Sequence, residues 1–367
     1  MTRKLFTSLG IFGCLFILQG AGSRHAAQDV PLNLRVNVVL VQLNVAVIDR
    51  QGNYVTGLRP EDFSITEDKI PQKISTFEEN KESESGPVEM ARRREKDLHA
   101  EEREAHPELA TSAAPGDAAS ISISRVAESN LFILFDTSNY MYRSFVFAQD
   151  AIADFIRSMD DATKIAFYSY SRNLSRATTL SSDQYRVISG VRNSVAGDDA
   201  ALYNSLLLTV KDASPLKGRK AIVVFSNGPD NASSVPPEDV AELAQSTGTL
   251  IYIISTRQAQ EDPISAAAFE RVSRASGGKA YFARDWRQEK QAFASIREDL
   301  VHLYTLSYYP QPNPNRGWRS IKVKLVGRDL QKYHIRTRDG YRLLPNAGGE
   351  ESETSEAGAI SLNSHSH

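Results

Sequence analysis

The sequence predicts an α/β fold: a doubly wound, Rossmann-like and mostly parallel sheet, together with a small β-sandwich built from N- and C-terminal strands. Two observations indicate this. Over residues 128–303, short apolar runs alternate with segments of helical periodicity, the pattern of strands that are buried on both faces and connected by helices. On either side, residues 28–80 and 304–345 alternate polar and apolar positions with the period of half-buried strands.

The first residues of the chain, 1–27, are predicted to be a secretory signal peptide. The basic pair Arg3-Lys4 precedes the apolar run Leu5–Leu18, and small residues follow, so we expect cleavage between Ser23 and Ala27. We therefore expect an extracytoplasmic protein, periplasmic or secreted, with no transmembrane helix in the mature chain.

Two alternatives stay open for this segment. It could remain as an uncleaved anchor, although the run is shorter than the ~17–25 residues that a spanning helix needs. It could also carry a lipid on Cys14, the only cysteine of the chain. Because the chain has a single cysteine, a disulfide framework, a cysteine zinc site and a CxxC redox pair are excluded.

The charge balance excludes another class of protein. The 43 Lys and Arg residues are matched by 45 Asp and Glu residues, which gives a formal net charge of −2. No basic field is available to hold a phosphate backbone, so we expect no nucleic-acid partner.

The first β segment, residues 28–80, alternates from Val36 to Phe77 and turns at Asp49–Asn53 and at Asp68-Lys69. Its strands are too few to form a sandwich alone. Residues 81–127 then pass from a mixed charge run to an Ala/Ser-rich stretch, which is typical of a disordered linker.

The α/β segment follows, with buried parallel strands separated by amphipathic helices. The strands are predicted at Leu131–Phe135, Lys164–Tyr170, Ala221–Phe225 and Leu250–Ile254, and the helices through Phe145–Met159, Leu202–Val210 and Val240–Ala244. Gly277-Gly278 ends a further helix before an edge strand at Lys279–Phe282, and a last helix covers Glu289–Leu303. Ligands of such sheets bind at the carboxyl ends of the strands.

The chain then returns to β signals. Tyr304–Tyr309, Ile321–Val326 and Tyr333–Thr337 are strand-like, and the acidic tail over 346–367 is predicted to be disordered. Because residues 28–80 and 304–345 each have too few strands to stand alone, we expect them to pair into one β-sandwich, with the α/β domain inserted between them.

Motifs of common enzyme classes do not occur in the sequence. There is no GxSxG elbow, HExxH helix, P-loop or GxGxxG turn after a strand. None of the 7 histidines falls at the end of a predicted α/β strand, where a general base would be expected, and His302 is expected at a helix end. We therefore expect no enzymatic activity, with a hydrolase on the α/β scaffold as the alternative.

The informative segment follows the first α/β strand. Asp136-Thr137-Ser138-Asn139-Tyr140, together with Ala200–Asn204 and Phe225–Asn231, resembles the von Willebrand factor type A domain over about residues 130–303. In that family an Asp-x-Ser-x-Ser loop, a Thr and a second Asp hold one divalent cation in a metal-ion-dependent adhesion site. Magnesium takes six oxygen ligands in an octahedron, and one position is left for a carboxylate of the partner.

The adhesion-site motif is incomplete in this chain. Asp136 and Ser138 match the first two metal ligands, but Tyr140 replaces the second Ser, Ala200 replaces the Thr, and Asn227 replaces the second Asp. A missing carboxylate removes an attraction of about 4 kcal/mol per unit of cation charge at 4 Å and an effective dielectric of ~20. We therefore expect no strongly bound metal and no other cofactor.

Three nearby carboxylates leave magnesium open as an alternative. They could complete the site, or they could serve turns and helix N-termini. They are Asp198, Asp199 and Asp230.

The resemblance implies protein–protein recognition. We expect a protein partner to bind the loop face at the carboxyl ends of the strands, around Asp136, Ser138, Tyr140, Ala200 and Asn227. The trio Tyr140, Met141 and Tyr142 would suit an interface if its side chains are exposed, or would lie partly buried under the loop. The alternative function is that of a structural module in an envelope assembly.

The flanking segments extend the resemblance. Val55–Phe63 with Glu67-Asp68, and Tyr304–Pro310 with Arg338–Tyr341, resemble a bacterial von Willebrand factor type A-related family known mainly from acidobacteria, over about residues 36–344. That family has no settled biochemical role, so this likeness bears on the fold and not on the function.

Overall fold

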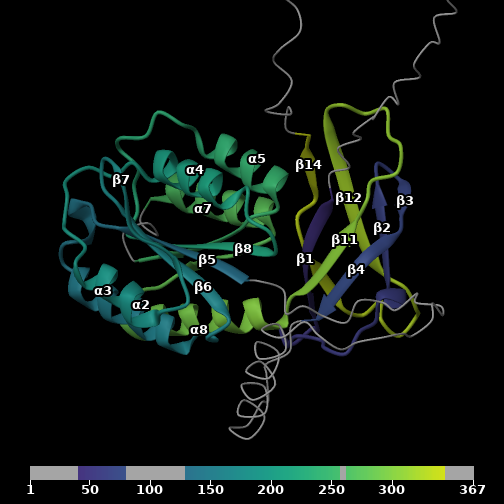
Figure 1. Ribbon diagram of the computed structural model, residues 1–367, viewed down its shortest axis with the longest axis horizontal. Coiled ribbons are helices and arrows are strands. Elements are labelled where there is room, and N and C mark those ends of the chain that lie inside the picture. The colour runs from purple at the N-terminus through teal and green to yellow at the C-terminus, as the bar shows by residue number, and fades with distance from the viewer. Residues whose placement is uncertain (1–39, 80–128, 257–261, 344–367) are drawn as a thin grey trace, which may run out of the picture. The chain divides into compact units, whose positions relative to one another are not determined.

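The structure, a computed structural model, describes residues 40–79, 129–256 and 262–343. The predicted signal peptide, the predicted linker over 81–127 and the predicted tail over 346–367 lie outside these ranges. Within them the predicted fold class is confirmed. A mixed, mostly parallel sheet carries helices on both faces, and two antiparallel sheets form a β-sandwich (Figure 1).

The α/β domain is built on a 6-stranded sheet with the order β10-β9-β8-β5-β6-β7. β5 (Ser129–Asp136) pairs in parallel with both β6 (Thr163–Tyr170) and β8 (Arg219–Ser226). β9 (Leu250–Ser255) and β10 (Ala280–Phe282) continue the sheet in parallel, whereas β7 (Leu174–Ser181) is antiparallel to β6. The central strands are apolar because both of their faces are buried.

Helices cover both faces of this sheet (Figure 1). One face packs against α2 (Phe145–Ser158), α3 (Gln184–Arg192) and α8 (Trp286–His302), and the other against α4 (Leu202–Ala213), α5 (Pro237–Thr247) and α7 (Pro263–Ser276). The helix boundaries have local causes. Asp183, Asp262 and Asp285 accept hydrogen bonds from amides of the first turn, and Gly277 takes the left-handed conformation that ends α7.

Strands from the two β segments pair in the sandwich. One 4-stranded sheet has the order β13-β1-β11-β4, and the other has the order β14-β12-β2-β3. β1 pairs with β11, and β2 pairs with β12, both antiparallel, so each sheet needs strands from both segments. The strands are β1 (Val41–Ile48), β2 (Phe63–Glu67), β3 (Ile70–Gln72), β4 (Ile74–Glu79), β11 (Tyr304–Tyr308), β12 (Trp318–Leu325), β13 (His334–Arg336) and β14 (Gly340–Arg342).

A buried polar network crosses the core of the sandwich. Glu67 is fully buried, and its Oε1 accepts a hydrogen bond from Nη1 of Arg319 at 3.0 Å. Its Oε2 accepts hydrogen bonds from the hydroxyls of Tyr308 at 2.9 Å and Tyr341 at 3.0 Å. The charge is therefore paired and hydrogen-bonded, as a charge inside a protein must be.

Three of the differences between the structure and the prediction have clear local causes. β7 was not predicted. It is a mostly exposed edge strand of polar composition, so it lacks the apolar run from which the other strands of this sheet were predicted. α3 buries only Val187 and Val191, too short a stripe to establish a helical period. α8 begins at Trp286 and not at Glu289, because Asp285 caps it.

Within the described ranges, no helix combines the length and the apolar character that a membrane crossing requires.

Candidate functional site

The predicted motif loops meet at the carboxyl ends of β5 and β8. Asp136 is the last residue of β5, and Asn227 directly follows β8. The side-chain amide of Asn227 donates a hydrogen bond to the main-chain carbonyl of Tyr140, in the short helix η2 (Asn139–Met141). The loop before α4 joins them, because the amide of Asn139 donates to the carbonyl of Asp198 at 3.0 Å.

Asp136 is a buried carboxyl at the centre of these loops. Its Oδ1 accepts the amide of Ser138 at 2.9 Å, and its Oδ2 accepts the hydroxyl of Ser226 at 2.9 Å. Tyr170 in turn donates its hydroxyl to Ser226 at 3.0 Å. Burial raises the pKa of the Asp136 carboxyl, and the hydrogen bonds from Ser138, Ser226 and Asn227 partly oppose this shift. Both oxygens of Asp136 therefore hold the loops together.

The motif residues do not fit a complete divalent-cation site. The hydroxyl of Ser138 is buried and has no hydrogen-bond partner among the described residues, so Asp136 and Ser138 offer oxygens. Ala200 has no ligand atom, and Asn227 uses its amide on Tyr140. Across residues 40–79, 129–256 and 262–343, no three His, Cys, Asp or Glu side chains group closely enough to hold a metal. The six oxygens that magnesium prefers are not assembled here.

The three carboxylates considered as replacement ligands each have another partner. Asp198 accepts the Tyr142 hydroxyl at 3.1 Å, Asp199 pairs with Arg172 at 3.2 Å, and Asp230 accepts the amide of Tyr203, in the first turn of α4, at 3.0 Å. The contact of Asp230 is that of a helix N-terminus, whereas Asp198 and Asp199 make side-chain contacts with a tyrosine and an arginine.

Most of the predicted partner-contact residues lie below the surface. Asp136, Ser138, Ala200 and Asn227 are buried, and Tyr140 is half-buried. Their part in partner binding stays a prediction, and the structure places them where they position the loops.

The trio Tyr140, Met141 and Tyr142 does not form one exposed surface. Met141 is fully buried, whereas Tyr142 is 51% exposed and donates its hydroxyl to the carbonyl of Gly197 at 3.0 Å. Of the two possibilities that the sequence left open, exposure or partial burial of this trio, the structure shows partial burial, because η2 turns Met141 into the apolar core of the α/β domain.

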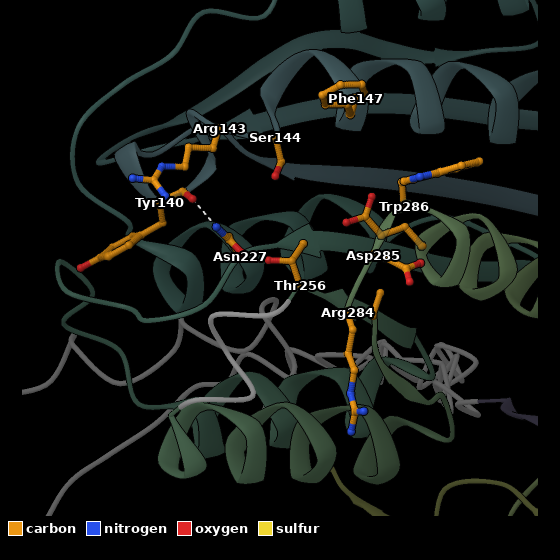
Figure 2. Close-up of a pocket in the computed structure, with 11 residues that line it drawn as sticks. Tyr140, Arg143, Ser144, Phe147, Asn227, Thr256, Arg284, Asp285 and Trp286 are labelled. Atoms are coloured by element: carbon orange, nitrogen blue, oxygen red, sulfur yellow. Dashed lines mark hydrogen bonds between the residues drawn. The ribbon is translucent and has the colours of Figure 1, made fainter.

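A pocket of about 430 Å³ lies beside the motif (Figure 2). It is bounded by the start of α2, by the residues that follow β8 and β9, and by the start of α8. Figure 2 shows the ring of Tyr140 pointing away from the pocket. The lining residues are Tyr140, Arg143, Ser144, Phe147, Asn227, Thr256, Ala283, Arg284, Asp285, Trp286 and Glu289.

Two exposed aromatic rings flank this pocket. Phe147 of α2 is 68% exposed and Trp286 of α8 is 54% exposed, and Figure 2 shows them on two sides of the pocket. The sequence interpretation missed both. A signal was available for Phe147, because the buried stripe of α2 contains Ala148, Ile152 and Phe155, and position 147 is out of phase with it.

Comparison with known families agrees with the predicted domain. Residues 130–295 match the family model of the von Willebrand factor type A domain. The predicted resemblance to that domain is confirmed over this part of the chain. A comparison with curated protein sequences finds no match.

Several solved structures are similar to part of this chain at low identity. The conserved hypothetical protein BatB from Bacteroides thetaiotaomicron is 14% identical, over 47% of this chain and 97% of that chain, with a TM-score of 0.40. The von Willebrand factor type A protein from Catenulispora acidiphila is 12% identical, over 60% and 67%, with a TM-score of 0.40. The vWF domain of the type V pili tip protein Mfa5 from Porphyromonas gingivalis is 11% identical, over 47% and 95%, with a TM-score of 0.41. Likeness at this level carries no argument about the fold or the function of this chain.

Proposed function

We propose that this protein binds a protein partner with the loop face at the carboxyl ends of β5, β8 and β9 and with the pocket beside it. The observation that carries the proposal is the exposure of Phe147 and Trp286, held by two helices at the edge of that pocket. Large rings of this kind in clusters mark interaction sites, and aromatic anchors that fill or flank pockets dominate binding energy. The type A domain supports the same role, since such domains often mediate protein interaction.

The buried motif residues have a supporting part in this proposal. Asp136 joins the loop after β5 to β8 through Ser226, and Asn227 fixes the main chain at Tyr140. Helix α2 follows this loop directly, so the loop contacts set the position from which Phe147 projects. Partner binding through exposed rings needs no metal ion, which is consistent with the incomplete ligand set.

We further propose that the face is not catalytic and that the protein works outside the cytoplasm. The first point is supported by the pocket lining, which includes no histidine and no nucleophile–base pair within hydrogen-bond distance among the described residues. The second is supported by the sequence pattern around Leu5–Leu18, which lies outside the described residues.

The proposal is tested by capture from the native envelope fraction with the tagged full chain. Phe147→Ala and Trp286→Ala should each reduce capture of the partner, because loss of an interface anchor costs about 2 kcal/mol or more, roughly 30-fold in affinity. Tyr140→Ala tests the predicted contact at the half-buried ring. Tyr185→Ala is the control, since Tyr185 is an exposed ring of α3 that does not line the pocket. Equal capture by the anchor variants and the unsubstituted chain would refute the assignment of this face.

A further inference from the structure

The pocket holds two buried polar side chains that the recognition role alone does not explain. The first is Thr256, directly after β9, which is 6% exposed. Its main chain is fixed, because its amide donates to the carbonyl of Ser226 at 3.3 Å. Its hydroxyl has no hydrogen-bond partner among the described residues. A buried hydroxyl without a partner is costly, so it points to a ligand atom or a water at this position.

The second is Glu289, in the first turn of α8, which is 7% exposed. Its carboxylate makes no hydrogen bond and no ion pair with any residue in the described part of the chain. Burial raises the pKa of the Glu289 carboxyl, and the nearby charge of Asp285 acts in the same direction. A cation that enters the pocket would stabilise this buried carboxylate by supplying the counter-charge that it lacks.

The other residues that line the pocket indicate which kind of cation could bind there. The buried carboxylate of Glu289 and the hydroxyl of Thr256 are too few ligands for a metal ion, which needs several hard oxygens. The second carboxylate of the lining, Asp285, is exposed and accepts amide hydrogen bonds at the start of α8. No group of three His, Cys, Asp or Glu side chains that could hold a metal occurs in the described ranges. The exposed rings of Phe147 and Trp286 instead offer apolar surface to the aliphatic stem of a long side chain.

We propose that this pocket binds a cationic side chain, lysine or arginine, of the partner protein, with Glu289 as its counter-ion and Thr256 as a hydrogen-bond acceptor. This rests on the proposed partner-binding role of the same face and adds the chemistry of the residue that enters it. The rings of Phe147 and Trp286 then pack against the stem of that side chain.

The other charged groups that face the pocket lie at its rim. They are Arg143 from the loop before α2, and Arg284 and Asp285 at the start of α8. All three are exposed, and Figure 2 shows both arginine side chains directed away from Thr256. Water therefore screens the two arginines, whereas the buried Glu289 is screened much less. The two rim arginines also favour acidic residues next to the inserted cation.

The test uses the full chain labelled with ¹⁵N and three small probes: the Nα-acetyl N-methylamides of lysine, arginine and norleucine. Lysine and arginine probes should shift the amide signals of Thr256 and Glu289 with saturation at millimolar concentrations, and the uncharged norleucine probe should bind at least about tenfold more weakly. Equal shifts with norleucine, or no shift with either cationic probe, would overturn the proposal.

Substitutions identify the carboxylate that binds the cationic probes. Glu289→Gln should weaken lysine binding about tenfold or more, because it removes the counter-ion but keeps the shape. Thr256→Val should weaken it by a smaller factor. Glu298→Gln is the matched control, since Glu298 lies on the same helix but is half-exposed and pairs with Arg297 at 3.0 Å. Unchanged binding by Glu289→Gln would contradict the assignment of the counter-ion.

The partner-binding proposal and the cationic-ligand proposal can be refuted independently of each other. If the cationic probes do not bind but partner capture still depends on Phe147, only the cationic-ligand proposal is refuted. If the probes bind but capture does not depend on Phe147 or Trp286, the partner-binding proposal is refuted and the pocket chemistry stands.

Discussion

Removal of Arg319 should destabilise the sandwich strongly. Its guanidinium is the only positive charge whose ion pair with the fully buried Glu67 is seen among the described residues. Arg319→Met keeps a long apolar stem but leaves the carboxylate without its counter-charge. Breaking a buried pair in this way costs about 3–5 kcal/mol. We expect the lower end, about 3 kcal/mol, because Tyr308 and Tyr341 still donate their hydroxyls to Glu67.

Two further variants separate the pair from general packing damage. Arg319→Met combined with Glu67→Gln should recover part of the lost stability, since no unpaired buried charge remains. Arg157→Met is the control. Arg157 pairs with Asp154 at a similar distance, 2.9 Å, but both side chains are about half-exposed, so its loss should cost less than about 1 kcal/mol.

The assay is urea denaturation followed by tryptophan fluorescence. The chain has only 2 tryptophans, and Trp318 lies in β12 of the sandwich whereas Trp286 lies in the α/β domain. In a Trp286→Phe background Trp318 reports unfolding of the sandwich for Arg319→Met, and in a Trp318→Phe background Trp286 reports unfolding of the α/β domain for the control Arg157→Met. A loss below about 1 kcal/mol for Arg319→Met, no larger than for the exposed pair, would refute the reasoning.

Three other predictions follow from the structure. Burial alone would raise the pKa of the Asp68 carboxyl, but hydrogen bonds from Asn313, Asn315 and Ser320 lower it to about 2 from an ordinary value of 3.8. Asp68 therefore contributes stability above about pH 4 that is lost as the pH falls toward about 2, and Asp68→Asn should flatten the acid limb of a pH–stability profile; an unchanged limb would contradict this. Gly278→Ala should destabilise by at least about 1–3 kcal/mol in thermal unfolding, because the new Cβ would lie 2.0 Å from the carbonyl oxygen of Ile251. Titration calorimetry with millimolar Mg²⁺ or Mn²⁺ should give no heat of specific binding, because the chain lacks the further oxygen ligands that would complete a metal site with Asp136 and Ser138; binding with a micromolar Kd would show that the ligand set is complete.

The parallel strands of the α/β domain could be predicted because they are buried on both faces. Each of the runs at Leu131, Ala221 and Leu250 is continuously apolar and has the length of a strand, which favours a strand buried on both faces over a buried helix. β7 could not be predicted in the same way, because an exposed edge strand needs no apolar run. The sandwich joins segments far apart in the chain, and their combination was predicted only by elimination, from the shortage of strands in each. The particular pairing of β1 with β11 was not predicted.

The candidate site was only partly predictable. The motif correctly predicted where the loops of the site come together, since Asp136 and Asn227 meet at the sheet edge. It did not show that the motif residues themselves are buried. The exposed anchors and the buried acid were readable as departures from helical phase. Phe147 is an apolar residue off the buried stripe of α2, and Glu289 is a charged residue on the stripe that Phe293 and Ile296 define in α8. The orphan hydroxyl of Thr256 depends on three-dimensional packing, so the sequence could not indicate it.

The central claim is that the face around Phe147 contacts a protein partner. It is tested most directly by placing the photoreactive residue p-benzoylphenylalanine at position 147 in the full chain, in its native envelope, with position 185 of α3 as the exposed aromatic control. We predict a discrete cross-linked protein at position 147 that is absent at position 185 and is lost when Trp286→Ala is added. No cross-linked protein at position 147, or the same products at both positions, would contradict the account.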